Sequence, residues 1–324
     1  MINKESLKIV FLGTPGFAVE SLRRLHEGGY NIVGVITMPD KTGGRGHKLI
    51  QSPVKEYAAA NGIKVMQPVS LKDEAFIAEL KSLNADLQIV IAFRMLPEVV
   101  WSMPPLGTFN LHASLLPKYR GAAPINWAVI NGEKETGVTT FFLKHEIDTG
   151  DVIQQERIAI ADNDNVGAVH DKLMLLGADM VIKTVDSIID GTIKSIPQNE
   201  LCNKDTQPTP APKIFKDTCR IDWSHSAAGI HNLVRGLSPY PAAWTAFYDN
   251  DGNESQIKIF ETALVTPEIP MHHKPGEIIT GDGSLKIMCG DMPLEILSVQ
   301  LSGKKRMSAV DFLRGFKAGS MICR

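Results

Sequence analysis

The chain has 324 residues, of which 44% are hydrophobic and 22% are charged. These proportions are ordinary for a folded protein in water, and they exclude a fibrous or largely disordered chain. A chain of this length is expected to form about two domains, each with its own core. The formal net charge is −2, so there is no global attraction to nucleic acid, although local patches can differ from the average.

The amino-terminal residues are polar and lead directly into a short apolar run. They contain neither the apolar core of a signal peptide nor an apolar stretch long enough to span a membrane. We therefore expect a cytoplasmic protein with no membrane association, and we expect it to be a monomer. The scattered cysteines predict neither a disulfide framework nor a metal site, and they are Cys202, Cys219, Cys289 and Cys323.

The first half of the chain alternates apolar runs with helical patterns. The runs predict strands at residues 8–12, 32–37, 63–65, 87–92, 109–111 and 137–143. The periodic segments predict helices at residues 17–25, from Ser52 onward, at 73–83 and at 166–190. Residues 38–49 have no periodicity and are expected to form a loop. This alternation is typical of an α/β fold with a Rossmann-like, mostly parallel sheet covered on both faces.

The composition changes after the longest predicted helix. Residues 195–212 contain four prolines and little periodicity, which indicates an extended linker. A helix at 227–237 and five short strands between 244 and 300 follow, and this pattern favours a small OB-like β-barrel domain. The predicted organisation is a catalytic domain at 1–194, a linker at 195–212 and a carboxyl-terminal barrel domain at 213–324.

Asn110 and His112 are the first candidates for chemistry. Because side chains alternate along a strand, both are expected on the same face of the strand at 109–111. The carboxyl end of such a strand opens toward the ligand crevice of an α/β sheet. An amide beside an imidazole can stabilise an oxyanion and move a proton. By contrast, the turn at Gly13 to Gly16 lacks the full dinucleotide fingerprint, and we interpret it as structural.

Asp148 is a third candidate, in a turn predicted between two strand-like runs, and it is followed by Thr149 and Gly150. Asp at such a position is commonly only a turn former. If the fold brought it near His112, its carboxylate would orient the imidazole. Spacing alone leaves both interpretations open. His145 and the pair His272 and His273 match no motif and are interpreted as surface or loop residues.

Residues 114–127 read SLLPKYRGAAPINW and are followed by ETGVT at 135–139. This stretch resembles the signature of the 10-formyltetrahydrofolate-dependent formyltransferases, and the resemblance extends over nearly the whole chain. It implies a catalytic trio of Asn110, His112 and Asp148. The implied activity is transfer of a formyl group from 10-formyltetrahydrofolate to the amino group of methionine on initiator methionyl-tRNA, for translation initiation. No covalent enzyme intermediate and no metal are implied.

The resemblance also implies where the folate binds. The expected contacts lie in two segments, and they are Phe93, Met95, Ser114, Leu115, Leu116 and Pro117. The chain departs from the family pattern at Arg94 and Ala113, where the family commonly has glycine. These two departures affect the expected shape of the folate pocket more than the chemistry.

Two basic segments are expected to bind the tRNA. The loop at 38–49 carries Lys41, Arg45 and Lys48 among three glycines. After Gly303 the tail has six basic residues against one acidic residue, and its cluster is Lys304, Lys305 and Arg306. Lys and Arg that contact phosphates bind nucleic acid through counterion release. The alternative for each segment is a solvated surface.

Other functions remain open at this stage. A formyltransferase acting on an amino-sugar nucleotide or on glycinamide ribonucleotide would share the catalytic trio. A non-catalytic RNA-binding protein with a small barrel is a candidate from another class. A complete set of Asn, His and Asp argues against the latter.

Overall fold

The structure is a computed structural model. It describes residues 3–43, 48–203, 206–248, 254–265, 273–281, 283–315 and 322–323, with the backbone alone for Lys48 and Ile322. Two compact units are present. The first comprises Met1–Pro124, Thr136–Ile158 and His170–Ala211, and the second comprises Ile125–Glu135, Ala159–Val169 and Pro212–Arg324.

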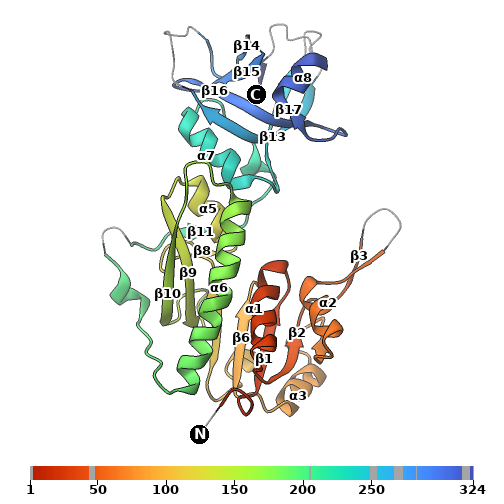
Figure 1. The fold of residues 1–324 in the computed structure, drawn as a ribbon, viewed down its shortest axis with the longest axis vertical. Coiled ribbons are helices and arrows are strands. Elements are labelled where there is room, and N and C mark those ends of the chain that lie inside the picture. Colours follow the sequence, from red (N-terminus) through yellow and green to blue (C-terminus); the bar gives the residue numbers. More distant parts are fainter. Residues whose placement is uncertain are drawn as a thin grey trace. The chain divides into compact units, whose positions relative to one another are not determined.

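A seven-stranded sheet forms the centre of the first unit (Figure 1), in the order β10-β9-β7-β6-β1-β2-β5. The pairs from β5 through β2, β1 and β6 to β7 are parallel, whereas β9 runs antiparallel to β7. The strands are β1 (Ile9–Gly13), β2 (Ile32–Ile36), β5 (Val65–Met66), β6 (Leu87–Ile91), β7 (Thr108–His112), β9 (Glu135–Phe142) and β10 (Val152–Ala159). The mostly parallel sheet predicted from the sequence is confirmed.

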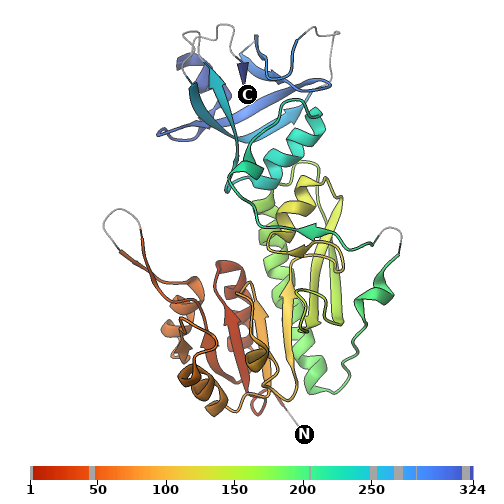
Figure 2. The same cartoon turned by 180° about the vertical axis from the view of Figure 1, so that it is seen from behind.

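Helices cover both faces of this sheet. Figure 1 shows α1 and α6 in front of it, and Figure 2 shows the segments between β5 and β7 on the opposite face. Apolar side chains of β1 and β6 pack with Phe76 and Leu80 of α3 and with Val100 of α4. The helices are α1 (Gly16–Glu27), α2 (Pro53–Ala60), α3 (Glu74–Ser82), α4 (Glu98–Trp101), α5 (Pro124–Ile130), which lies mainly in the second unit, and α6 (Val166–Ile189).

Local signals explain where several helices begin. The Ser52 side chain accepts the N–H of Lys55 at 3.1 Å, and Pro53 occupies the first turn of α2, as the sequence predicts. Asp73 caps α3 in the same way, at 2.9 Å from the N–H of Phe76. Among the helices that the structure describes, none is long and apolar enough to cross a membrane.

Two short pairings lie outside the main sheet. Strands β3 (Lys41–Gly43) and β4 (Lys48–Ile50) form an antiparallel hairpin, so the expectation of an irregular loop at 38–49 was wrong for these residues. Their backbone pairing is local and needs no apolar periodicity. In the second pairing, β8 (Arg120–Gly121) runs parallel to β11 (Pro210–Ala211).

The second unit is built around an antiparallel sheet in the order β14-β15-β16-β13-β12-β18, with β17 on β16. The N–H of Cys323 in β18 donates to the carbonyl of Gly276, just before β14, at 2.8 Å. This bond joins the two ends of the sheet, and the expected small barrel is confirmed. Its elements are η2 (Asp217–Cys219), α7 (Ala227–Leu237), β12 (Ala243–Tyr248), β13 (Glu254–Leu264), β14 (Ile278–Gly281), β15 (Ser284–Met288), β16 (Pro293–Leu301), β17 (Met307–Ser308), α8 (Ala309–Gly315) and β18 (Ile322–Cys323).

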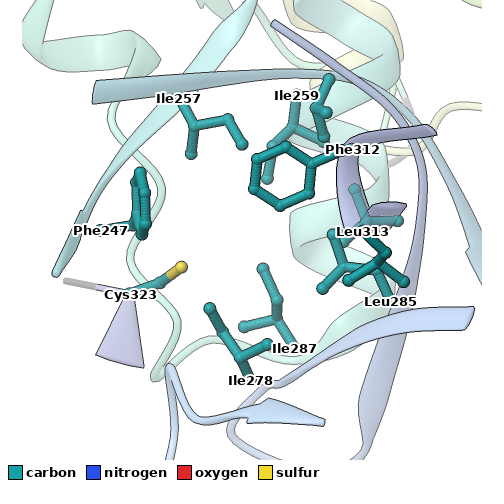
Figure 3. A pocket seen from close by; sticks show the side chains of 11 residues that line it. Phe247, Ile257, Ile259, Ile278, Leu285, Ile287, Phe312, Leu313 and Cys323 are labelled. Atoms are coloured by element: carbon teal, nitrogen blue, oxygen red, sulfur yellow. The ribbon is translucent and has the colours of Figure 1, made fainter. Parts of the chain in front are cut away.

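The interior of the barrel is apolar. Figure 3 shows side chains such as Phe247, Ile257 and Phe312 pointing toward one another around a cavity. Cys323 lies at its edge, and burial raises the pKa of its thiol to about 12. At neutral pH this thiol therefore stays uncharged and packs as a small apolar group.

Candidate active site

Asn110 and His112 lie on β7 at the junction between the parallel strands and β9. Asn110 is opposite Phe141 and His112 is opposite Thr139 in the antiparallel register. His112 is only 6% exposed. The ring of Phe141 meets the imidazole edge-on at 6.5 Å between centroids. The position of this imidazole is therefore restricted by the strand and by its aromatic neighbour.

A backbone carbonyl fixes the orientation of the His112 ring. Nε2 lies 2.8 Å from the carbonyl oxygen of Tyr119. Because a carbonyl oxygen only accepts hydrogen bonds, Nε2 must carry the proton in this contact. Nδ1 is then the nitrogen that can accept or release a proton. It faces Oδ2 of Asp148 at 3.9 Å, so the structure brings together the two residues that the sequence left apart.

Asp148 occupies a turn with an unusual backbone conformation. Its φ is +55°, in the left-handed region that non-glycine residues rarely adopt. The carboxylate accepts the N–H of Gly121 at 2.9 Å through Oδ2. Two positions later only glycine fits, because a Cβ on Gly150 would lie 1.5 Å from the carbonyl oxygen of Phe142. These contacts direct the carboxylate toward His112.

The side-chain oxygen of Asn110 is buried and has no hydrogen-bond partner among the described residues. Buried polar atoms are nearly always paired, and one that is unpaired calls for an explanation such as a ligand or a catalytic role. A half-turn of the amide about its terminal bond exchanges the acceptor oxygen and the donor nitrogen. In either orientation, the Asn110 amide keeps hydrogen-bonding capacity that no described residue uses.

Hydrogen bonds from the sheet hold the segment after His112. Thr139 Oγ1 donates to the carbonyl of Ser114 at 2.6 Å and accepts the N–H of Leu116 at 3.1 Å. Gln155 Nε2 donates to the carbonyl of Leu116 at 2.7 Å. The side chain of Ser114 is itself engaged with the carbonyl of Lys118 at 2.7 Å. The segment is therefore a fixed wall beside the imidazole.

The residues expected to contact folate differ in exposure. Ser114, Leu116 and Pro117 are buried. Phe93 and Leu115 are partly exposed. Met95 is 72% exposed. The buried members shape the wall, while the others leave part of their apolar surface exposed.

Arg94, one of the departures from the family pattern, crosses to a neighbouring loop. Its Nη1 and Nη2 donate to the carbonyls of Val69 at 2.8 Å and Pro68 at 2.5 Å. Its Nε is buried without a partner in the described structure. Burial lowers the pKa of this guanidinium. The side chain thus fastens the segment after β6 to the segment after β5.

The basic residues expected to meet tRNA fall into three groups. Lys41, Lys304 and Lys305 are exposed. Arg45 lies outside the described residues, and for Lys48 only the backbone in β4 is described. Arg306 is exposed as well, but it contacts other residues of the barrel domain: it donates to Glu261 Oε1 at 2.6 Å and to Ser298 Oγ at 2.7 Å and stacks 4.5 Å from the ring centroid of Phe260.

A polar network holds the base of the β3–β4 hairpin. Lys55 Nζ lies 2.5 Å from Asp40 Oδ2, and Gln67 Nε2 donates to Asp40 Oδ1 at 2.7 Å and to the carbonyl of Met38 at 2.8 Å. The Lys55 hydrogen bond lowers the pKa of the Asp40 carboxyl. This network was not predicted from the sequence, because no pattern connects residues 38, 55 and 67.

The geometry combines an amide with an unpartnered oxygen, an imidazole whose Nδ1 makes no hydrogen bond to a described residue, and a facing carboxylate, which are groups that acyl transfer can use. Among the described residues, no group of three or more His, Cys, Asp or Glu side chains could hold a metal ion. The formyl transferase family model matches residues 7–185, and the model of the formyl transferase C-terminal domain matches residues 213–317. The chain therefore belongs to the formyl transferase family.

Similar curated sequences include methionyl-tRNA formyltransferases, which form one class within this family. The methionyl-tRNA formyltransferase of Bacteroides fragilis (strain YCH46) is 59% identical over 318 residues, which cover 97% of each chain. The methionyl-tRNA formyltransferase of Phocaeicola vulgatus is 60% identical over 318 residues, covering 98% of each chain. Among solved structures, an N-formyltransferase from Helicobacter canadensis in complex with folinic acid and dTDP-3-aminofucose aligns with a TM-score of 0.64 at 20% identity, covering 93% of this chain and 100% of that chain. This last similarity is one of fold.

Proposed function

We propose that the chain transfers the formyl group of 10-formyltetrahydrofolate to the amino group of methionine on initiator methionyl-tRNA. The observation that carries this proposal is the full-length identity of 59% to 60% with methionyl-tRNA formyltransferases. The site at the end of β7 supplies the groups that the reaction needs. We further propose that it acts as a cytoplasmic monomer, with residues 1–194 responsible for catalysis and residues 213–324 for binding tRNA.

Asn110, His112 and Asp148 have distinct roles in this proposal. When the methionine amine attacks the formyl carbon, negative charge develops on the formyl oxygen, and the Asn110 amide donates a hydrogen bond to it. Protonated His112 stabilises the same charge through Nδ1. Asp148 accepts the proton that the attacking amine loses, directly or through water, and returns it to the folate nitrogen as the bond between that nitrogen and the formyl carbon breaks.

The folate segment and the basic residues complete the proposal. Phe93, Met95 and Leu115 provide apolar surface for the folate, and the wall at Ser114, Leu116 and Pro117 keeps it beside His112. Lys41, Arg45 and Lys48, together with Lys304 and Lys305, contact tRNA phosphates. The engagement of Arg306 with Glu261 and Phe260 favours a structural role for this residue.

Three acceptors offered in parallel test the proposal. Purified protein with 10-formyltetrahydrofolate is assayed with initiator methionyl-tRNA, an amino-sugar nucleotide and glycinamide ribonucleotide. We expect formylation of methionyl-tRNA alone at a measurable rate. Preferential formylation of either small acceptor would replace the proposed substrate, and no transfer to any acceptor would refute the activity.

A further inference from the structure

Gln198 is a buried residue in the proline-rich segment that was expected to be a linker. It opens the 3-10 helix η1 (Gln198–Leu201) and is 3% exposed. Its Nε2 donates to the carbonyls of Asp148 at 2.8 Å and Gly150 at 2.9 Å. Its Oε1 accepts Nε of Arg120 at 3.1 Å and Nη2 of Arg120 at 2.6 Å. The amide therefore uses both of its donors and both acceptor positions.

These bonds hold the Asp148 turn from its backbone side. The turn has left-handed backbone at Asp148, a conformation that persists only where the surroundings enforce it. The same turn is held from the side-chain end by the N–H of Gly121. Gly121 follows Arg120 in the chain. Gln198 therefore holds the backbone of Asp148, and the neighbour of its partner Arg120 holds the Asp148 carboxylate.

An amide is the side chain that fits this position. It must donate to two carbonyl oxygens and accept from a guanidinium at once. A carboxylate of the same size would satisfy Arg120 but would place negative charge against both carbonyls, and an apolar side chain would leave the guanidinium and the carbonyls unpaired. The contacts of Gln198 thus go to the backbone of the residue that faces His112.

We propose that Gln198, together with Arg120, is a positioning residue for formyl transfer. It acts by holding the Asp148 turn so that the carboxylate faces Nδ1 of His112. The inference rests on the proposed function and on the role proposed for Asp148. Gln198 itself touches neither reactant.

Gln198→Glu tests this inference because it keeps the acceptor for Arg120 and removes both donors to the turn. We expect kcat for methionyl-tRNA to fall about tenfold or more, with KM and folate affinity within about twofold of the parent. Gln154→Glu is the matched control, since Gln154 contacts Ser187 at 3.3 Å and belongs neither to the catalytic trio nor to the contacts that hold the Asp148 turn. The kcat of this variant should stay at the parent value. A parent-like kcat in folded Gln198→Glu would overturn the inference.

A double-mutant cycle separates positioning from general stability. If Gln198 acts through Asp148, then Gln198→Glu should reduce kcat only slightly further, by less than about twofold, in an Asp148→Asn background. Fully additive losses would overturn the inference. If Gln198→Glu fails to fold, Arg120→Lys replaces it in the same cycle, because it keeps the charge and loses the paired donation to Oε1. Absence of formyl transfer in the parent would refute the proposed function instead.

Discussion

Nδ1 of His112 and Oδ2 of Asp148 face each other across 3.9 Å. This separation is within ion-pair range but too long for a direct hydrogen bond. Nε2 donates to the carbonyl of Tyr119 at 2.8 Å, so Nδ1 is the nitrogen that faces the carboxylate. Nδ1 and the carboxylate border the same space. A substrate proton or a water molecule in that space would contact both groups.

Asp148→Asn tests the role of the charge. The variant keeps an oxygen that can accept the N–H of Gly121, so its fold should be maintained. Without the carboxylate, turnover should fall by about a hundredfold, because the amine proton loses its acceptor. Steady-state kinetics and a thermal unfolding curve check the prediction together. Near-parent turnover would remove Asp148 from the mechanism.

Gly150→Ala tests the shape of the turn. A Cβ at this position would lie 1.5 Å from the carbonyl oxygen of Phe142, so the turn or strand β9 must move. We expect a loss of stability of about 1–3 kcal/mol by urea unfolding, together with reduced turnover. Gly16→Ala is a suitable control because a Cβ there meets nothing within 4 Å. Equal unfolding midpoints for the two variants would contradict the prediction.

The burial of His231 is expected to make the stability of the protein depend on pH. It is 8% exposed and bonds Thr262 Oγ1 at 2.9 Å through Nδ1, and burial lowers the pKa of its imidazole from 6.5. As pH falls below 6.5, the unfolded chain binds this proton before the folded chain does. The free energy of unfolding should therefore fall with pH until the folded-state pKa is passed.

His231→Gln should remove this component of the pH dependence. Urea unfolding at a series of pH values compares it with the parent and with His225→Gln, in which an exposed histidine is replaced. The His225→Gln variant keeps His231, so it should retain this component of the pH dependence. If the His231→Gln curve is parallel to that of the parent, the burial argument for His231 is wrong.

The barrel lysines predict a salt dependence. Lys304 and Lys305 are exposed, and each phosphate contact contributes about 0.7–0.9 to the slope of log affinity against log salt. Replacing both by Ala should reduce the slope for tRNA by about 1.4–1.8 while folate affinity stays unchanged. Arg306→Ala should leave the slope unchanged and lower stability by roughly 1 kcal/mol, since it removes a cation–π contact and two hydrogen bonds. An unchanged slope in the double lysine variant would exclude these phosphate contacts.

Much of the fold is predictable because its signals are local. The helix Ala227–Leu237 and the Ser52 cap follow from periodicity and capping chemistry. The edge strand Val152–Ala159 was predicted only as a strand-like run after the Asp148 turn, without bounds, since its sequence VIQQERIA mixes apolar and polar residues without strict alternation. The hairpin of β3 and β4 was not predicted. The pairing between Lys41 and Ile50 is made by backbone groups, and it requires no particular side chains that a sequence pattern could reveal.

The site is less accessible to sequence reasoning. Strand alternation and the motif identify Asn110 and His112, but the partners of His112 and Asp148 depend on tertiary structure. Gln198 is the clearest case, since its partners lie 48, 50 and 78 residues away. Arg120 at least belongs to the motif at 114–127, whereas Gln198 lies in a proline-rich segment that carries no such signal.

The most direct test of the central claim is the single-turnover rate of formyl transfer to initiator methionyl-tRNA in the parent, His112→Ala and Asn110→Ala. With enzyme in excess over saturating substrates, the rate reports the chemical step rather than binding or product release. We predict that each variant, folded by its thermal unfolding curve, transfers formyl about a hundredfold or more slowly than the parent. A folded His112→Ala variant that transfers formyl at nearly the parent rate would contradict the assignment of this site.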